Sequence, residues 1–334
     1  MLKIERVSID NLKEIMSDED FNQTVFTTYQ WVCFLKKNGK GEPVVFRISE
    51  NSKVIAFFVG LVFKVLGLRF VGSPFEGWGT CDMGFCAKRD VDVSSLIVPV
   101  KNYVFKKLKC SYLEIVDPKI GLNELSDIRC NVILQRTLIL PINRLEQDIF
   151  HSFKGDCRNY IRQFERRGAT ITEALPSREF ADEYYDQLIQ VFAKQKLRPF
   201  YDKKKVYDLM DTYENNADHI LCLRVCNPEG ICIATSIFIG FKETFYFWGN
   251  ASYTEFQNYR PNEYMIWYAI KYWKERGVVS FDMVGFREYK RKFSPNSVEY
   301  PRIVLAKYPG MYQVRNFTKR LIQLVRKVIG QTVL

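Results

Sequence analysis

The first half of the chain contains two hydrophobic patterns with different periods. Residues 44–48 and 54–63 are rich in β-branched and aromatic side chains, and a short polar segment separates them. This arrangement predicts a hairpin of two β-strands. Residues 91–107 have a helical pattern and lead into an apolar segment at 111–117, which predicts a helix followed by a strand.

The second half begins its own series of strands after residue 219. Residues 220–226, 231–241 and 244–250 are apolar and aromatic, and Pro228 and Gly230 lie between the first two. Proline and glycine mark turns, so these segments predict three antiparallel strands.

A helix and a strand complete this half, as they do the first. Apolar residues at helical spacing predict a helix over 262–276, and Gly277 is a typical terminator. The strand expected at 278–284 contains Asp282 late in its length, as the corresponding strand of the first half contains Glu114. The chain therefore predicts two similar units, each with a hairpin, a helix and a strand.

These patterns predict an α/β (α+β) protein of two tandem domains with mixed, mostly antiparallel sheets flanked by helices. The expected domains cover residues 1–145 and 146–310, with a boundary near 141–151. Residues 311–334 are expected to form a basic amphipathic helix, centred on 316–330, that either docks on the body of the protein or contacts a membrane surface.

The composition of the chain limits the kinds of partner that it is expected to bind. The 334 residues carry a formal net charge of +11, which favours an anionic partner such as nucleic acid, a phosphorylated cofactor, an acidic carrier protein or an anionic membrane. The longest apolar run, residues 54–63, is too short to cross a bilayer, and the N-terminus lacks the pattern of a signal peptide. Nine irregularly spaced cysteines indicate reduced thiols in a cytosolic protein and no metal site.

The segment after the last predicted strand is the strongest candidate for chemistry. Asp282 stands where α/β sheets place ligands, and Gly285 permits close backbone approach. Lys290 can stabilise developing negative charge, while Tyr289 can stack on a base or sugar and Phe293 completes the aromatic–basic cluster. The alternative is a basic surface loop in which Asp282 is merely paired.

A second candidate is a stripe of arginines. Arg158, Arg162 and Arg166 are four residues apart and share one face of a helix. Such a stripe can hold phosphates, and it can equally be a solvated surface paired with Asp156 and Glu165.

The strand at 244–250 is unusually aromatic. Phe245 and Phe247 face one side, and Tyr246 and Trp248 face the other. One set is expected in the core, and the other either packs as well or lines a cleft together with Tyr253 and Tyr259.

Several common catalytic motifs are missing. The sequence contains no phosphate-binding G-x-x-x-x-G-K-[ST] loop, no G-x-G-x-x-G after a strand and no G-x-S-x-G elbow. Neither His151 nor His219 lies in a recognisable catalytic sequence. Kinase, dehydrogenase and hydrolase functions are therefore disfavoured.

Three segments together resemble the FemAB family and its GNAT-like relatives of polysaccharide loci. Residues 27–39, "TTYQWVCFLKKNG", resemble the family's N-terminal helix with its T-x-x-W motif. Residues 158–168, "RNYIRQFERRG", resemble the opening of the transferase domain. Residues 245–296 resemble the family's most characteristic stretch, in which an aromatic strand precedes a helix, a G-x-x-x-x-D-x-x-G segment and an aromatic–lysine pair.

The resemblance implies two tandem GNAT-like domains and a reaction that forms an amide from an amine and an activated acyl or aminoacyl ester. It implies that Lys290 steadies the donor and the transition state, with Tyr289 beside it, and that Asp282 and Gly285 form the strand-end pair. The coenzyme A loop [RQ]-x-x-G-x-[GA] is absent, as is the helical arm that some members use for tRNA. The family also has an arginine before the helix that corresponds to the one near residue 205. In this sequence Lys196 or Arg198 could serve in its place.

These observations lead to a functional hypothesis. The chain is expected to be an acyl- or aminoacyltransferase acting on an amino group of a cell-envelope glycan precursor, either an amino sugar or a stem peptide. Expected catalytic residues are Lys290, Asp282 and Tyr289, and expected substrate-binding residues are Arg158, Arg162, Tyr246, Trp248, Tyr253, Gly285 and Phe293. No metal and no tightly bound cofactor are expected.

The sequence alone does not identify the donor or the acceptor. The donor is expected to be acyl-CoA, an acyl carrier protein or aminoacyl-tRNA, and the acceptor a nucleotide- or lipid-linked glycan. The protein is expected in the cytoplasm, with peripheral contact at the inner face of the membrane as an option. The alternative function is a non-catalytic tandem module that binds nucleic acid or an anionic membrane surface.

Overall fold

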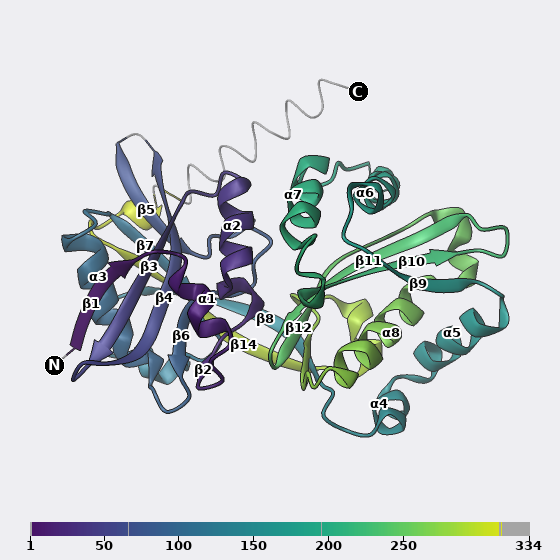
Figure 1. Cartoon of the computed structure of the whole chain (residues 1–334), viewed down its shortest axis with the longest axis horizontal. Coiled ribbons are helices and arrows are strands. Elements are labelled where there is room, and N and C mark those ends of the chain that lie inside the picture. The colour runs from purple at the N-terminus through teal and green to yellow at the C-terminus, as the bar shows by residue number, and fades with distance from the viewer. Residues whose placement is uncertain (1, 66, 195, 314, 316–334) are drawn as a thin grey trace.

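The computed structural model describes residues 2–65, 67–194, 196–313 and 315, and shows two α/β halves joined side by side (Figure 1). Fourteen strands of the described residues form one sheet, in the order β1-β3-β4-β5-β7-β14-β8-β13-β12-β11-β10-β9, with β6 paired to β4 and β2 paired to β6. The predicted mixed, mostly antiparallel fold is confirmed: the two neighbouring pairs that run parallel are β5–β7 and β12–β13.

The strands have the following bounds: β1 (Leu2–Val7), β2 (Phe21–Asn22), β3 (Glu42–Glu50), β4 (Lys53–Val65), β5 (Leu68–Ser73), β6 (Gly84–Lys88), β7 (Tyr112–Val116), β8 (Asn131–Pro141), β9 (Thr170–Ala174), β10 (Ile220–Cys226), β11 (Cys232–Phe241), β12 (Thr244–Ser252), β13 (Ser280–Asp282) and β14 (Asn296–Ala306). The α-helices are α1 (Asn11–Met16), α2 (Tyr29–Lys37), α3 (Ile97–Lys106), α4 (Glu146–Ser152), α5 (Gly155–Arg166), α6 (Arg178–Ala193), α7 (Lys203–Tyr213) and α8 (Pro261–Glu275).

The first half is built on the predicted hairpin. Strands β3 and β4 pair antiparallel, and the turn between them has Asn51 and Ser52 at positive φ, as a tight hairpin requires. Helix α2 begins where the Thr28 hydroxyl accepts a hydrogen bond from the Trp31 N–H. Its apolar residues face the sheet, and its last turn carries Lys36 and Lys37, where cations favour the helix dipole.

The second half contains the three predicted antiparallel strands, β10, β11 and β12. Helix α8 connects β12 to the parallel strand β13, with Pro261 in its first turn, and the chain leaves it through Gly277 at φ +80°. In the first half α3 has the same place before β7. The helix predicted over 91–107 is shorter than expected, because residues 93–96 form a 3₁₀ turn before α3 begins.

The two halves share strands. β8, the last strand of the first half in sequence, pairs with β13 of the second half. β14, which follows the second half, pairs with β7 of the first. β8 and β14 also pair with each other from Asn296–Ile139 to Val304–Asn131, so each half completes its sheet with a strand from the other. The domain limits at residues 145 and 310 remain predictions, and residues 316–330, where the basic helix is expected, lie outside the described residues.

Both faces of the sheet are covered. Helices α2, α6 and α7 pack on one face over a central apolar cluster to which both halves contribute. On the other face α3 covers the first half, and α4, α5 and α8 cover the second. In Figure 1, α2 of the first half and α7 of the second lie next to each other at the middle of the molecule.

Candidate active site

A cavity of about 2070 Å³ lies where the two halves meet on the face that carries α2, α6 and α7. Phe26 and Thr80 contribute to its walls from the first half, and Tyr246 and Trp248 from β12 of the second. The strand-exchanged elements also contribute, through Gln135, Arg136, Tyr300 and Arg302. Because these walls belong to different elements, the site depends on the assembly of both halves.

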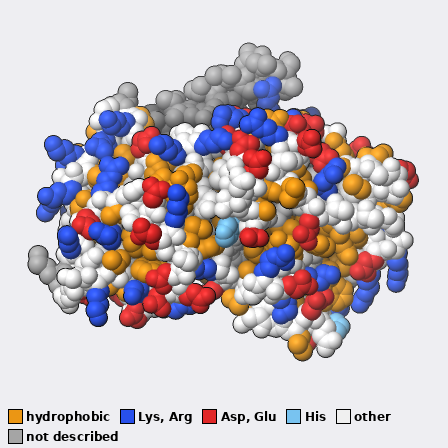
Figure 2. Space-filling model, in the orientation of Figure 1, with side chains coloured by type: hydrophobic (Ala, Val, Ile, Leu, Met, Phe, Trp, Pro, Cys, Tyr) orange, Lys and Arg blue, Asp and Glu red, His pale blue; other side chains and the backbone are white. Residues whose placement is uncertain are grey.

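Cations predominate among the charged residues of this cavity. The described residues of its lining include eight lysines and arginines against two acids, Glu76 and Asp202; the cations are Lys37, Lys40, Arg136, Lys196, Arg198, Lys204, Lys205 and Arg302. On one face of the whole molecule, by contrast, positive and negative side chains are interspersed (Figure 2). The imbalance is therefore a local property of the cavity, and it favours an anionic ligand.

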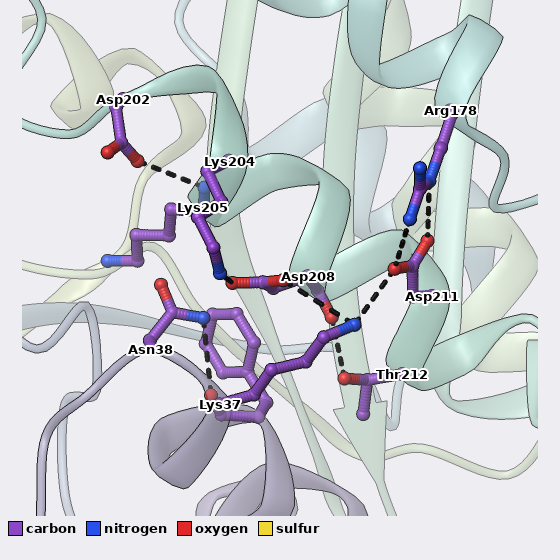
Figure 3. A network of polar contacts seen from close by, with 10 residues as sticks. Lys37, Asn38, Arg178, Asp202, Lys204, Lys205, Asp208, Asp211 and Thr212 are labelled. Carbon is purple, nitrogen blue, oxygen red and sulfur yellow. Dashed lines mark hydrogen bonds and ion pairs between the residues drawn. The ribbon is translucent and has the colours of Figure 1, made fainter.

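An ion-pair network joins the two halves at the edge of the cavity (Figure 3). Lys37 of α2 lies 2.8 Å from Asp211 and 3.4 Å from Asp208, both on α7. Arg178 of α6 donates to both oxygens of Asp211, at 3.2 and 3.0 Å, and Lys204 pairs with Asp208. The hydrogen bonds from Arg178 and then from Lys37 lower the pKa of Asp211 to about 2, so the network is ionised at neutral pH.

Lys205 is a buried cation in the cavity wall. Its side chain is 7% exposed, and Nζ donates to the Trp78 carbonyl at 3.1 Å. Nζ lies 5.1 Å from the ring centroid of Tyr201 and 5.8 Å from that of Trp248. Burial, aided by the charge of Lys40, lowers the pKa of Lys205 to about 8. An anionic ligand would compensate for this desolvation.

A second donor lies close to the Lys205 ammonium. The indole Nε1 of Trp248 is buried and finds no hydrogen-bond partner in the described part of the chain. Gly79, at φ +74°, passes between the two groups: a Cβ there would lie 2.8 Å from Lys205 Nζ and 3.8 Å from Trp248 Nε1. Glycine at position 79 thus lets the Lys205 ammonium pack close to the backbone, and we call Lys205, Trp248 and Gly79 the lysine subsite.

Tyr246 connects the cavity to a buried acid. It lines the cavity, and its hydroxyl donates to Asp82 Oδ2 at 3.3 Å. The other oxygen of Asp82 accepts from the Thr24 hydroxyl at 2.9 Å. Asp82 is 3% exposed, and burial together with the nearby carboxylate of Asp117 raises its pKa to about 7. A carboxyl group with this pKa can both accept and release a proton at neutral pH.

The chain bends sharply at the end of β13. Val284 and Gly285 both have positive φ, +57° and +72°, and both line the cavity. Positive φ is strained for a β-branched residue such as valine, so other contacts must hold the bend. Asp282 supplies some of them, since it accepts from the Thr137 hydroxyl and from the Val284 N–H at 2.7 Å.

Lys290 supplies further contacts that hold the bend at Val284 and Gly285. It lies in the 3₁₀ turn Glu288–Phe293 and is 5% exposed. Its Nζ donates to the carbonyls of Met283 and Val284 at 2.6 and 2.7 Å. Burial lowers the pKa of Lys290 to about 8, while the carboxylate of Asp282 acts in the opposite direction. The bend also explains why the strand predicted over 278–284 ends at Asp282.

The structure brings some of the predicted site residues together and leaves others apart. Tyr246, Trp248 and Gly285 line the cavity, and Asp282 and Lys290 lie behind the bend that forms part of its wall. The remaining predicted residues lie outside the cavity lining: Arg158, Arg162, Tyr253, Tyr289 and Phe293.

Each of these outlying residues has a distinct environment. Arg158 and Arg162 lie on α5, which packs with α8 on the opposite face of the sheet. Arg158 donates to the His151 carbonyl, and Arg162 lies over the Phe150 ring. Phe293 is fully buried in the core and Tyr289 is 56% exposed, while Tyr253 lies at the end of β12. Their roles in binding remain predictions.

Sequence reasoning did not identify Asp82 or Lys205. Asp82 lies in a loop with no motif around it, and Lys205 is one of three consecutive lysines at the start of α7. The available signal was weak and electrostatic: three cations in the first turn of a helix oppose its dipole, and one acid, the N-cap Asp202, directly precedes them.

The GNAT resemblance raises the question of a coenzyme A site, which requires free backbone N–H groups at the start of the helix after the central strand. That helix is α8. Its first residue, Pro261, has no N–H, and the side chain of Asn262 is bound to Asn250 at 3.2 Å. Glu263 adds a negative charge there and is paired with Lys292. These residues do not fit a pyrophosphate.

The described ranges lack two further features. No group of three or more histidine, cysteine, aspartate or glutamate side chains there is arranged to hold a metal ion. No helix of those ranges has the length and apolar character needed to cross a membrane.

Residues 151–291 match the acetyltransferase (GNAT) domain family Acetyltransf_6. No curated protein matches the sequence of the chain. The fold resembles that of FemX, with a TM-score of 0.72 and 14% identity over 90% of this chain and 96% of FemX. It also resembles L-PGS from Bacillus licheniformis, with a TM-score of 0.57 and 14% identity over 95% of this chain and 98% of that one.

A tandem GNAT protein from the clavulanic acid biosynthesis pathway gives a further match, with a TM-score of 0.51 and 8% identity over 92% of this chain and 99% of that protein. These likenesses concern the fold. Together with the family match they confirm the predicted resemblance to GNAT-like and FemAB-like transferases.

Proposed function

We propose that this chain, which carries a GNAT-type acyltransferase domain in residues 151–291, transfers an acyl or aminoacyl group to an amino group of a cell-envelope glycan precursor bound in the cavity between its halves. The observation that carries the proposal is the pair formed by Tyr246 and Asp82. It places a carboxyl group with a pKa of about 7 next to a hydroxyl in the cavity wall.

Amide formation requires the attacking amine to lose a proton. In the proposed reaction the amine attacks the carbonyl carbon of the donor, and its proton passes to the Tyr246 oxygen while the tyrosine proton passes to Asp82. The bond from the acyl carbon to the leaving oxygen or sulfur then breaks, and the proton returns from Asp82 to that atom. General acid–base assistance of this kind accounts for rate factors of about 10²–10⁴.

The bend at Val284 and Gly285 provides a rigid wall beside this pair. Asp282 and Lys290 position the wall, because they bind its N–H and carbonyl groups. An ammonium group has three N–H donors, and two of those of Lys290 reach these carbonyls. From behind this wall, the positive charge of Lys290 is proposed to stabilise, without direct contact, the negative charge that develops on the carbonyl oxygen of the donor. Tyr289 is proposed to orient the donor.

The acceptor is proposed to bind through an anionic group at the lysine subsite. Lys205 and Trp248 offer two donors there, and the surrounding cations favour a phosphate or carboxylate. Both a nucleotide-linked and a lipid-linked glycan precursor carry such a group. The aromatic rings of Tyr201 and Trp248 supply faces on which a sugar or base can pack.

The donor is proposed to be an acyl carrier protein or an aminoacyl-tRNA rather than acyl-CoA. The start of α8 is poorly suited to a coenzyme A pyrophosphate, since Pro261 has no N–H and the paired Glu263 and Lys292 supply no net positive charge. Both remaining donors are anionic macromolecules, in keeping with the net charge of +11. The reaction is proposed to take place in the cytoplasm.

The test combines identification of ligands with a transfer assay. Mass spectrometry of the purified protein, for co-purified tRNA, carrier protein or nucleotide sugar, selects the substrates. Amide formation is then measured with the wild type and with Asp82→Asn, Tyr246→Phe and Lys290→Ala, and with Asp127→Asn as a surface carboxylate control. We expect the first three to lose activity and the control to keep it. Full activity in both Asp82→Asn and Tyr246→Phe would remove the proposed proton path.

The alternative of a non-catalytic binding module predicts cations spread over a convex surface. The described residues instead gather cations and aromatic side chains around a cavity, next to a buried acid of raised pKa. This convergence supports an enzyme.

A further inference from the structure

The segment between α6 and α7 combines exposed apolar side chains with cations. Phe200 is 86% exposed and Leu197 is 52% exposed, and Ile189 near the end of α6 is 45% exposed. All three line the cavity together with Ala193 and Pro199, so they form its rim. We call Ile189, Ala193, Leu197, Pro199 and Phe200 the apolar rim.

The cations of this segment alternate with the apolar residues. Lys196 and Arg198 flank Leu197, and Lys194 precedes them at the end of α6. No acidic residue occurs between Lys194 and Tyr201. In Figure 1 the connection between α6 and α7 lies at the edge of the molecule, away from the sheet.

The apolar rim is not a continuation of the core. Phe200 makes an edge contact with Phe192, at 5.2 Å between ring centroids, and otherwise faces outwards. A soluble surface rarely gathers several large apolar side chains at one site unless a partner covers them. The question is which partner fits both the apolar groups and the positive charge.

The C-terminal segment of the same chain does not fit. Residues 316–330 include Lys319, Arg320, Arg326 and Lys327, so their charge has the same sign as that of the rim. A nucleic acid fits the cations but not the aliphatic side chains, because bases stack on aromatic rings, and the rim offers a single exposed aromatic ring. An anionic bilayer fits both, since apolar side chains insert at the interface while lysine and arginine reach the headgroups.

We infer that the apolar rim is a membrane-docking surface that inserts Phe200 and Leu197 into the interface of an anionic bilayer. The contact is peripheral and adds to whatever the C-terminal segment contributes. Docking at this site turns the mouth of the cavity towards the lipid. If the proposed function holds, the acceptor then enters the cavity from the bilayer, which favours a lipid-linked precursor over a nucleotide-linked one.

Binding to vesicles tests docking without any enzymatic assay, so its outcome is independent of the proposed function. The full chain is sedimented with vesicles of phosphatidylglycerol and phosphatidylcholine, and with vesicles of phosphatidylcholine alone. We expect binding to the anionic vesicles that weakens with salt. The double variant Leu197→Ser/Phe200→Ser is expected to lower the partition coefficient by roughly tenfold or more, because two apolar side chains no longer insert.

Matched controls lie elsewhere on the chain. Leu175 is 78% exposed and precedes the first turn of α6, whereas Leu197 and Phe200 of the rim follow its last turn, and a helix of 16 residues is about 24 Å long. Leu175→Ser is expected to bind like the wild type. For charge, Lys194→Glu/Lys196→Glu is expected to weaken binding to anionic vesicles, and Lys106→Glu/Lys107→Glu on α3 is expected to leave it unchanged.

Three results would overturn the inference. The first is equal binding by Leu197→Ser/Phe200→Ser and Leu175→Ser, with loss of binding only when residues 316–334 are removed. The second is the absence of vesicle binding by the wild type. The third is binding of RNA that the lysine variant abolishes while vesicle binding is unaffected.

A spectroscopic test reports insertion directly. Tryptophan placed at position 200 by Phe200→Trp is expected to be quenched by brominated lipids in anionic vesicles, beyond the quenching of the five native tryptophans. Leu175→Trp is expected to add no such quenching. Equal quenching of the two variants would show that the rim does not enter the bilayer.

Discussion

Glu114 and Asp282 occupy corresponding positions in the two halves, and their surroundings differ. Each is the third residue of the strand that follows a crossover helix and runs parallel to its neighbour. Glu114 is fully buried and binds two cations, Arg302 and Arg315, the second at 2.8 Å. Asp282 forms no ion pair within the described ranges, and burial raises its pKa.

The difference shows that corresponding positions of the two halves can have different roles. In the first half the strand-end acid is neutralised by cations and holds β14 and the chain after it in place. In the second half the acid binds a hydroxyl and a backbone N–H, and the bend next to it faces the cavity. Chemistry is therefore expected where the acids lack cationic partners, at Asp282 and at Asp82.

The largest expected effect is on turnover, and it tests that assignment at Asp82. Asp82→Asn keeps the shape of the side chain but cannot accept the proton, so kcat is expected to fall by about 10²–10⁴. The wild-type rate is expected to rise with pH through about 7, as Asp82 ionises, and to fall above about 8, as Lys205 and Lys290 lose their protons. The pH profile of kcat measures both limbs. An unchanged acidic limb in Asp82→Asn would assign it to another group.

The next largest effect is on stability, and it compares the two strand-end acids directly. Glu114→Gln leaves the buried Arg302 and the partly buried Arg315 without their charge partner, which is expected to cost about 3–5 kcal/mol of unfolding free energy. Asp282→Asn keeps an oxygen acceptor for Thr137 and Val284 and is expected to cost only about 1 kcal/mol. Urea unfolding measures both. Equal losses of unfolding free energy in the two variants would mean that the two acids contribute equally to stability.

A third prediction uses the pH dependence of stability. The pKa of Asp82 is about 7 in the folded chain, above its ordinary value of 3.8, so the folded state holds the proton more tightly than the unfolded state. The stability that this proton provides is complete below about pH 4 and is lost as the pH rises through 7. The loss amounts to at most about 4 kcal/mol. Asp82→Asn is expected to remove this decline between pH 4 and 7, and an equal decline in both proteins would contradict it.

The smallest effect concerns the network that joins the halves. Lys37 and Asp211 are partly exposed, so their coupling in a double-mutant cycle of Lys37→Ala and Asp211→Asn is expected to be about 0.5–1 kcal/mol. The coupling should decrease with salt. A coupling of zero would mean that this ion pair adds nothing measurable to the contact between the halves.

Much of the fold was predictable because its elements have local signals. The hairpin of β3 and β4, the strands β10 to β12 and helix α8 follow from periodicity and from turn residues such as Gly230 and Gly277. The bend at Val284 was not predictable, because a valine at positive φ contradicts local preference and is held by Lys290 from six residues away.

The candidate site was only partly predictable for a similar reason. Tyr246 and Trp248 were expected to share one face of a strand, and both line the cavity. Asp82 becomes distinctive only when Asp117 and Tyr246 approach it from distant parts of the chain. The exchange of β8 and β14 between the halves also has no local signal.

The exchange of β8 and β14 has a consequence for biosynthesis. A nascent chain that has emerged only through residue 145 has an incomplete first half: β7 presents an open edge, because the strand that covers it is Asn296–Ala306. Open edges recruit other strands, so a ribosome that stalls within the second half would expose a site for aggregation. We therefore expect the first half to complete its sheet only after nearly the whole polypeptide has been synthesised.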